Sequence, residues 1–285
     1  MTHGAASATL RLTPPFDGLG LLAWLQPRLI AGVEAIRGRT YARIVNLPHG
    51  PGVVELTLAA DHVAARFDLT DPRDTATATR RSRRLLDLDL DPAVVDAALR
   101  QDPVLAPRVA ATPGIRLPGQ VDGFEAAVRA IVGQQVSVAG ARTVLGGIAR
   151  RFGTAVDLPL AREYGLDRAF PVAAGLVDLP ADALPMPRGR AAAITAVARA
   201  VDAGSLDLNH DADPVAAREA LLAIRGVGPW TADYVRMRAW SDPDVLLDTD
   251  LVLRRVLARE GLDRAHADRW RPWRSYASLH LWRTA

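Results

Sequence analysis

The hydrophobic pattern of the chain changes its period near Asp71, and this change limits the folds that are open to it. Between residues 8 and 70, apolar and polar residues alternate in the stretches ATLRLT, TYARIVNL, GVVELTLAAD and AARFDLT, which are interrupted by one helical stretch, GLGLLAWLQPRLI. A period of two predicts half-buried strands. From Asp71 onward the apolar residues recur with a helical period. The chain is therefore predicted to be α+β, with a small amino-terminal antiparallel sheet followed by a mostly α-helical body.

The length of the chain and its helix-breaking residues indicate how it is divided into domains and helices. With 285 residues, 49% of them hydrophobic, the chain is long enough for roughly two domains. We expect an amino-terminal α+β domain over residues 1–85 and a helical region over 86–285. Within the helical region, the stretch 121–153 reads as two helices hinged at Gly133 to Val136, with Ser137 as the N-cap of the second.

Two residue types are absent, and their absence excludes several kinds of chemistry. The chain has no cysteine, which excludes disulfides, thiolate metal sites, cysteine nucleophiles and iron–sulfur clusters. It also has no lysine, so all 35 strong cations are arginine and a lysine Schiff base is excluded. Arginine suits phosphate, although a GC-rich genome also favours arginine over lysine. Composition thus permits nucleic acid as a partner without establishing it.

The sequence gives no sign of a membrane segment. No apolar run reaches the roughly 18 residues that a spanning helix needs. The opening MTHGAASATL lacks a charged region followed by an apolar one, the pattern of a signal peptide. We therefore expect a cytoplasmic protein with no membrane partner.

The stretch LLAIRGVGPWTADYV at residues 221–235 is the most specific local motif. A helix ends at Gly226 and Gly228, which permit close backbone approach, and Pro229 starts the next helix at no cost in hydrogen bonds. Such a turn directs free N–H groups and a helix N-terminus outward, which fits a DNA phosphate. We expect phosphate contacts at Gly226, Gly228 and Thr231. An ordinary tight connection between two helices is the alternative.

The other side of the same turn presents backbone carbonyl groups. Those of Leu222, Ile224 and Val227 are suited to hold a monovalent cation, so a structural Na⁺ or K⁺ is a candidate there. No cofactor is required by the chemistry considered below.

Several motifs in order resemble one family. The pattern L-x-x-I-x-G-V-G-P-W-T-A is similar to the helix-hairpin-helix signature of a large DNA glycosylase superfamily. GQQVS at 133–137, DVLLDTDLVLRRVL around Asp250 and WRPWRSYASLHLW at 270–282 resemble 3-methyladenine DNA glycosylase II, as do the amino-terminal PPFDGLGLLAWL and YAR-x-x-x-L. The resemblance covers essentially the whole chain. It implies a helical glycosylase body whose two lobes, roughly 118–230 and 86–117 plus 231–285, flank a cleft.

Asp250 stands where the resembling family places its catalytic aspartate. It begins the helix LVLRRVLARE, so an N-cap is the alternative interpretation. The two interpretations are compatible, because a helix N-terminus favours an ionised carboxylate. An anion beside C1′ stabilises an oxocarbenium-like sugar or orients water against it.

Four aromatic residues are candidates for a base pocket. Trp230 and Tyr234 are four residues apart and share one helix face, where core packing is the alternative role. The resemblance implies that they line a pocket together with Trp24 and Trp282. Alkylated purines are often cationic, and aromatic rings attract cations by about 0.5–2 kcal/mol each.

The resemblance also bears on the reaction type. Family members that nick the DNA backbone carry a lysine where this sequence has Trp230. The expected activity is therefore monofunctional hydrolysis: a monomer flips alkylated bases such as 3-methyladenine and 7-methylguanine out of double-stranded DNA and leaves an abasic site. Alternatives are an oxidised-purine glycosylase with lyase activity and a non-catalytic helix-hairpin-helix DNA-binding protein.

Gln135 matches the position at which the resembling family inserts a wedge into the space left by the flipped base. A glutamine here would fill that space partly by hydrogen bonding, and a loop residue that caps a helix is the alternative.

Some charged residues are weaker candidates. Four arginines are expected near the DNA face, although each is individually more typical of a solvated surface: Arg142, Arg190, Arg225 and Arg236. Asp242, Asp244 and Asp248 have a spacing seen in divalent-metal sites, but no glycine pattern or closing glutamate follows, and we expect a solvated acidic turn.

Overall fold

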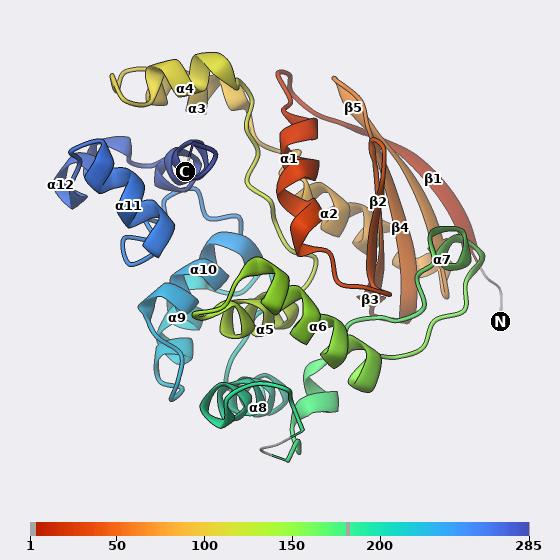
Figure 1. The fold of residues 1–285 in the computed structure, drawn as a ribbon. Helices are drawn as coiled ribbons and strands as arrows, with labels where there is room; N and C mark the ends of the chain where they lie inside the picture. The colour runs from red at the N-terminus through yellow and green to blue at the C-terminus, as the bar shows by residue number, and fades with distance from the viewer. Residues whose placement is uncertain (1–3, 181–182, 285) are drawn as a thin grey trace.

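A five-stranded antiparallel sheet forms the amino-terminal part of the computed structural model, which describes residues 4–180 and 183–284 (Figure 1). The strand order is β1-β5-β4-β3-β2. The strands are β1 (Gly4–Arg11), β2 (Glu34–Arg37), β3 (Thr40–Leu47), β4 (Gly50–Leu58) and β5 (His62–Leu69). The predicted antiparallel sheet is confirmed. Only β2 was missed, because four residues give too short an alternation to recognise.

Both faces of the sheet are covered. On one face, Tyr41 and Val45 of β3 pack in a core with α1 (Gly18–Leu25) and α2 (Thr75–Leu85). On the other face, Ala42 and Ile44 pack against α7 (Pro159–Tyr164) and its flanking residues. Figure 1 shows α1 and α7 on opposite sides of the sheet. A segment from the middle of the helical region thus returns to the amino-terminal sheet, which the sequence did not predict.

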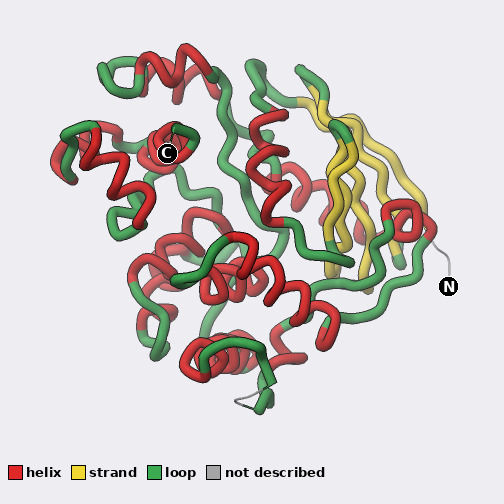
Figure 2. Tube along the Cα trace, viewed as in Figure 1, coloured by secondary structure: helices red, strands yellow, loops and turns green. Residues whose placement is uncertain are grey.

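The remaining helices form two groups beside the sheet, and Figure 2 shows all strands gathered on one side of the molecule. The helices are α3 (Pro92–Leu99), α4 (Ala106–Ala111), α5 (Gly123–Gly133), α6 (Val138–Phe152), α8 (Arg188–Asp202), α9 (Pro214–Leu222), α10 (Pro229–Ala239), α11 (Leu251–Arg259), α12 (Arg264–Ala267) and α13 (Arg274–Trp282). One core unites α5, α6, α8, α9 and α10. A second unites α3, α4, α11 and α13 with the end of α10. The α+β class is confirmed.

The break between α5 and α6 lies where the sequence predicted it. Gly133 ends α5, and Ser137 caps α6 by accepting a hydrogen bond from the amide of Gly140 at 3.1 Å. The short loop between these helices is therefore fixed at both ends, and three of its residues are exposed: Gln135, Val136 and Ser137.

A buried network of charges joins the sheet to α5. Arg43 of β3 lies 2.7 Å from Glu125 and 3.3 Å from Glu34, and Arg129 contacts both carboxylates at 2.7 Å. Burial alone would raise the pKa of Glu34, but Arg129 and Arg43 lower it to about 2. The network is fully paired, so it holds α5 in one position against the sheet.

In the part of the chain that the structure describes, no helix is long and apolar enough to cross a membrane.

Candidate active site

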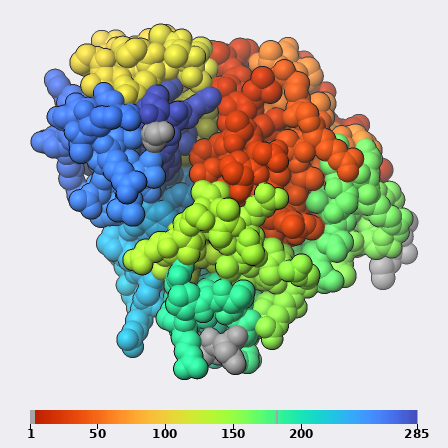
Figure 3. Space-filling view, in the orientation of Figure 1, coloured from red at the N-terminus to blue at the C-terminus, as the bar shows by residue number. Residues whose placement is uncertain are grey.

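A pocket with a volume of about 590 Å³ opens where α1, the α5–α6 loop, α10, α11 and α13 meet. Figure 3 shows the amino-terminal segment in red, the α5–α6 segment in yellow-green and the carboxy-terminal helices in blue meeting on one face. The pocket has the size of a typical small-molecule site. It is lined by all five residues that the sequence assigned to catalysis and base binding: Trp24, Trp230, Tyr234, Asp250 and Trp282.

Asp250 is fixed by hydrogen bonds from three helices. It is the N-cap of α11, where Oδ1 accepts from the amides of Val252 at 3.0 Å and Leu253 at 2.9 Å. The indole nitrogen of Trp230 on α10 donates to Oδ2 at 3.2 Å, and that of Trp282 on α13 donates to Oδ1 at 3.2 Å. The two interpretations of Asp250, as a cap and as a pocket carboxylate, therefore hold in the same residue.

This arrangement suits an electrostatic role better than proton abstraction. Four N–H donors occupy lone pairs of the Asp250 carboxylate, so few remain to take a proton from water. The donors also hold the anion in one orientation inside a pocket with a largely apolar wall. A preorganised negative charge of this kind stabilises positive charge that develops beside it.

One face of α10 presents a ladder of three side chains at intervals of four residues. The rings of Trp230 and Tyr234 stack with centroids 5.2 Å apart and planes inclined by 15°. Arg238 follows, and it donates to the Tyr234 hydroxyl at 2.7 Å. The two aromatics share a helix face, as their spacing indicated, and they form one continuous wall of the pocket. Arg238 was missed, although the same spacing extended by four residues points to it.

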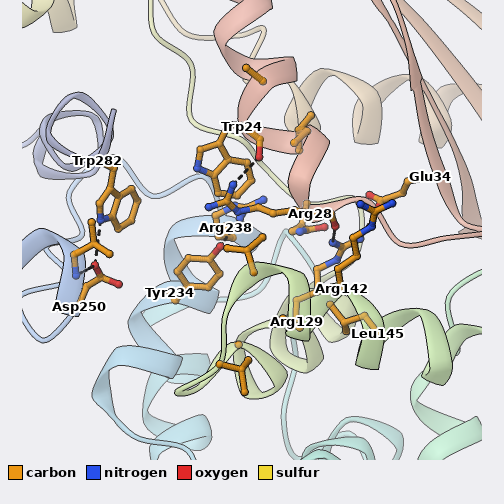
Figure 4. A pocket seen from close by; sticks show the side chains of 18 of the residues that line it. Trp24, Arg28, Glu34, Arg129, Arg142, Leu145, Tyr234, Arg238, Asp250 and Trp282 are labelled. Carbon is orange, nitrogen blue, oxygen red and sulfur yellow. Dashed lines mark hydrogen bonds and ion pairs between the residues drawn. The ribbon is translucent and has the colours of Figure 1, made fainter. Parts of the chain in front are cut away.

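Trp24 lies in the pocket, but its ring is not a free aromatic surface. The guanidinium carbon of Arg28 lies 3.9 Å from the ring centroid, and that of Arg238 lies 4.3 Å from it. Burial lowers the pKa of both arginines. In Figure 4, Trp24, Arg28 and Arg238 lie close together, across the pocket from Asp250 and Trp282. The expectation that Trp24 attracts a cationic base needs correction, because two guanidinium groups already engage its ring.

The predicted wedge residue stands on a loop that a neighbouring glutamine anchors. Gln135 is exposed and has a φ of 53°, a conformation that non-glycine residues adopt rarely. Gln134 donates to the Gly226 carbonyl at 3.0 Å and to the Thr231 hydroxyl at 2.8 Å, and its own carbonyl accepts from Arg190 at 2.7 Å. Sequence reasoning missed Gln134, because its partners lie 56 to 97 positions away along the chain.

The hairpin between α9 and α10 has the backbone that the sequence predicted. Gly226 has a φ of 92°, and a Cβ there would lie 3.1 Å from the Cβ of Ala193. Both the backbone conformation and the limited space therefore favour glycine at this position. Gly228 is the N-cap of α10. The side chain of Thr231, by contrast, is buried. This residue is only 2% exposed and its hydroxyl is bonded to Gln134. A phosphate contact at Thr231 would therefore use its backbone amide in the first turn of α10, and this contact stays a prediction.

The carbonyls expected to hold a cation are compatible with that role. The Ile224 carbonyl accepts from the Val227 amide at 3.0 Å, which leaves one of its two lone pairs for an ion. The Gly226 carbonyl bonds to Gln134 instead. Leu222, Ile224 and Val227 therefore stay the candidate ligands.

Each of the three acidic residues before α11 contacts an arginine. Asp242 contacts Arg236 at 2.6 Å. Asp244 contacts Arg274 at 2.6 Å, and Asp248 contacts Arg264 at 2.5 Å. The described residues hold no group of three or more metal-ligating side chains. The expectation of a solvated turn is therefore wrong for Asp242 and Asp244, whereas Asp248 forms an exposed ion pair. Arg236 was expected near the DNA face, but its guanidinium is paired with Asp242.

The other candidate arginines lie in different surroundings. Arg142 lines the pocket. Arg190 bonds to the Gln134 carbonyl, and Arg225 is exposed at the hairpin. Three exposed apolar side chains also line the pocket, and sequence reasoning missed them: Val136, Val138 and Val252.

Comparison with known proteins identifies the family of the chain. Residues 7–122 match the family model described as the AlkA N-terminal domain. The chain is 34% identical to DNA-3-methyladenine glycosylase 2 of Escherichia coli, over 97% of this chain and 96% of that protein. The chain belongs to the AlkA family of DNA glycosylases. The family resemblance seen in the sequence is thereby confirmed.

A second AlkA relative is longer than this chain. The chain is 41% identical to the probable bifunctional transcriptional activator/DNA repair enzyme AlkA of Mycobacterium tuberculosis, over 99% of this chain but only 57% of that protein. Among solved structures, a 3-methyladenine DNA glycosylase from Archaeoglobus fulgidus superposes with a TM-score of 0.82 at 19% identity, covering 96% of this chain and 97% of the other. This likeness shows that the two chains share a fold.

Proposed function

We propose that the chain is a monofunctional DNA glycosylase of base excision repair, which flips alkylated bases out of double-stranded DNA and hydrolyses their glycosidic bonds. The substrates are 3-methyladenine, 7-methylguanine and related bases, and the product is an abasic site. One observation carries this proposal: Asp250 stands in a pocket of about 590 Å³, large enough to admit a flipped base, with its carboxylate held by the indoles of Trp230 and Trp282. The names of the AlkA relatives support the same reaction.

The reaction follows from the placement of one carboxylate. The departing base takes the electron pair of the glycosidic bond, and positive charge develops on C1′ and the ring oxygen of the sugar. The anion of Asp250 stabilises that charge. Water then adds its oxygen to C1′ and releases a proton, which passes to the solvent or to a departing base that carries negative charge. A methylated purine that already bears a positive charge is a better leaving group than an undamaged base. The enzyme therefore favours damaged bases partly because their glycosidic bonds break more readily.

The absence of lysine supports hydrolysis without strand cleavage. A lyase step through a lysine Schiff base is unavailable to a chain with no lysine. The indole of Trp230, at the position of that lysine in nicking relatives, instead donates a hydrogen bond to Asp250. An oxidised-purine glycosylase with lyase activity is accordingly disfavoured, and a nick in duplex DNA containing 8-oxoguanine would argue for it.

The DNA duplex would lie across the hairpin and the α5–α6 loop. The backbone at Gly226 and Gly228, together with the N-terminus of α10, suits a phosphate, and Gln135 suits the space left by the flipped base. A Na⁺ or K⁺ ion held by the carbonyls of Leu222, Ile224 and Val227 would stiffen this turn. The monomeric state and the cytoplasmic location expected from the sequence stay predictions.

Asp250→Asn tests the proposal. Asparagine caps a helix about as well as aspartate, so α11 keeps its N-cap while the negative charge is lost. We expect single-turnover release of 7-methylguanine from methylated duplex DNA to fall on the order of 10³-fold. Asp91→Asn is the matched control, because Asp91 caps α3 by accepting from the Ala93 amide at 3.0 Å and lies outside the pocket lining. Undiminished release by Asp250→Asn would refute the mechanism.

A further inference from the structure

Gln120 places a buried hydrogen-bond acceptor in the wall of the pocket. The residue lines the pocket and is only 9% exposed. Among the described residues, its Oε1 is a buried side-chain oxygen without a hydrogen-bond partner. Buried polar atoms in folded proteins are nearly always paired, because an unpaired one loses its hydration without compensation. An orphaned acceptor in a binding pocket therefore points to a donor on the ligand.

The backbone that carries Gln120 is held from two sides. The Gly119 amide donates to the Leu85 carbonyl at 3.0 Å, and the Gly119 carbonyl accepts from Arg238 at 3.2 Å. Arg238 also donates to the carbonyl of Pro118. A Cβ at Gly119 would lie 2.2 Å from the backbone oxygen of Arg84, so α2 packs directly on this turn. Gln120 is thus presented on a rigid segment, as a specificity contact requires.

The other carboxylates of the pocket are already engaged. Asp250 accepts from four N–H groups. Glu34 accepts from the Ile30 amide at 2.8 Å, from the Tyr41 hydroxyl at 2.6 Å and from two arginines. By contrast, Arg28 and Arg238 supply further donors to the pocket. Among the buried side-chain oxygens of the described residues that line this pocket, Gln120 Oε1 is the one without a partner, which makes it a candidate acceptor for an N–H group on a ligand.

We propose that Gln120 is a specificity-determining residue, whose Oε1 accepts a hydrogen bond from an amino group or a ring N–H on the outer edge of the flipped base. This inference rests on the proposed glycosylase function and narrows its substrate class to damaged bases that keep an N–H donor on that edge. A base that lacks such a donor leaves the oxygen unpaired and gains nothing from Gln120.

Two neutral bases distinguish this role. Hypoxanthine has a ring N–H on its outer edge, whereas 1,N6-ethenoadenine has none. We expect Gln120→Met, which keeps a similar side-chain volume, to lower single-turnover release of hypoxanthine about tenfold, as the loss of one hydrogen bond does. Release of ethenoadenine should change by less than about twofold. Gln120→Glu keeps an oxygen acceptor and should restore hypoxanthine release to within about threefold of the wild type.

Gln101→Met is the matched control, because Gln101 is exposed near the end of α3, away from the pocket. Circular dichroism melting of each variant establishes that it is folded. Equal losses on both bases in Gln120→Met, or a wild type that releases 7-methylguanine but not hypoxanthine, would overturn the role of Gln120 while leaving the glycosylase function intact. A wild type that releases no base from any of these substrates would instead overturn the proposed function.

Discussion

The indole nitrogen of Trp282 lies 3.2 Å from Oδ1 of Asp250, so a donor from α13 fixes the carboxylate that begins α11. Both helices belong to the same core, and the contact therefore ties the carboxylate to the packing of that core. An aromatic residue that was expected only to hold the base thus also positions the anion. These two roles can be separated, because the ring and its N–H group can be changed independently.

Trp282→Phe keeps an aromatic wall and removes the N–H donor. Hydrogen bonds to charged groups contribute about 1.5–3 kcal/mol, so we expect the single-turnover rate of base release to fall about 10- to 100-fold, with little change in affinity for DNA. Trp240→Phe is the control, since Trp240 also donates an indole hydrogen bond, at 3.1 Å, but to the carbonyl of Ala212. A loss of DNA affinity with an unchanged rate would assign Trp282 to binding alone.

Only some of the residues that line the pocket could be predicted from the sequence. Asp250 and Trp230 carry recognisable local signals, a helix start and a hairpin helix, so family resemblance assigns them correctly to one site. Arg28 and Gln120 have no such signals. Arg28 is singled out because its guanidinium lies over the Trp24 ring, and Gln120 because its Oε1 lacks a hydrogen-bond partner. Both features exist only in the folded chain.

The fold shows the same division. The two helices predicted within residues 121–153, α5 and α6, begin and end within one or two residues of the predicted positions. The six-residue helix α7 offers hardly two turns of pattern, so the sequence could not indicate that it packs on the outer face of the sheet. Short elements owe their structure to tertiary packing rather than to local propensity.

Glu125→Gln should unfold the protein much more readily, because Glu125 pairs with two buried arginines, Arg43 and Arg129. Removing one partner of a buried ion pair leaves an uncompensated charge and costs about 3–5 kcal/mol. Urea denaturation measures the free energy of unfolding. Glu163→Gln is the control, since its pair with Arg66 is about half exposed and should contribute less than about 1 kcal/mol. Similar effects of the two substitutions would contradict a stabilising role for the network.

Asp87 should make the stability of the protein fall as the pH rises from about 4 to about 6. Burial raises its pKa to about 6, although its Oδ2 accepts from the Leu117 amide at 3.0 Å and from the Tyr276 hydroxyl at 2.8 Å. The unfolded chain releases this proton near pH 4. Between these values the folded state binds more protons than the unfolded state, so the free energy of unfolding decreases with pH, by about 3 kcal/mol in total.

Asp87→Asn isolates this contribution. Asparagine keeps an oxygen for both hydrogen bonds and tolerates the φ of 53° at this position, but it does not titrate. Relative to the wild type, the variant should therefore gain about 3 kcal/mol in its free energy of unfolding between pH 4 and pH 7. Urea denaturation across this range measures the difference, and Asp89→Asn, at an exposed carboxylate two residues away, controls for the loss of charge. A difference between Asp87→Asn and wild type that stays constant with pH would show that Asp87 is not protonated in the folded protein at pH 5.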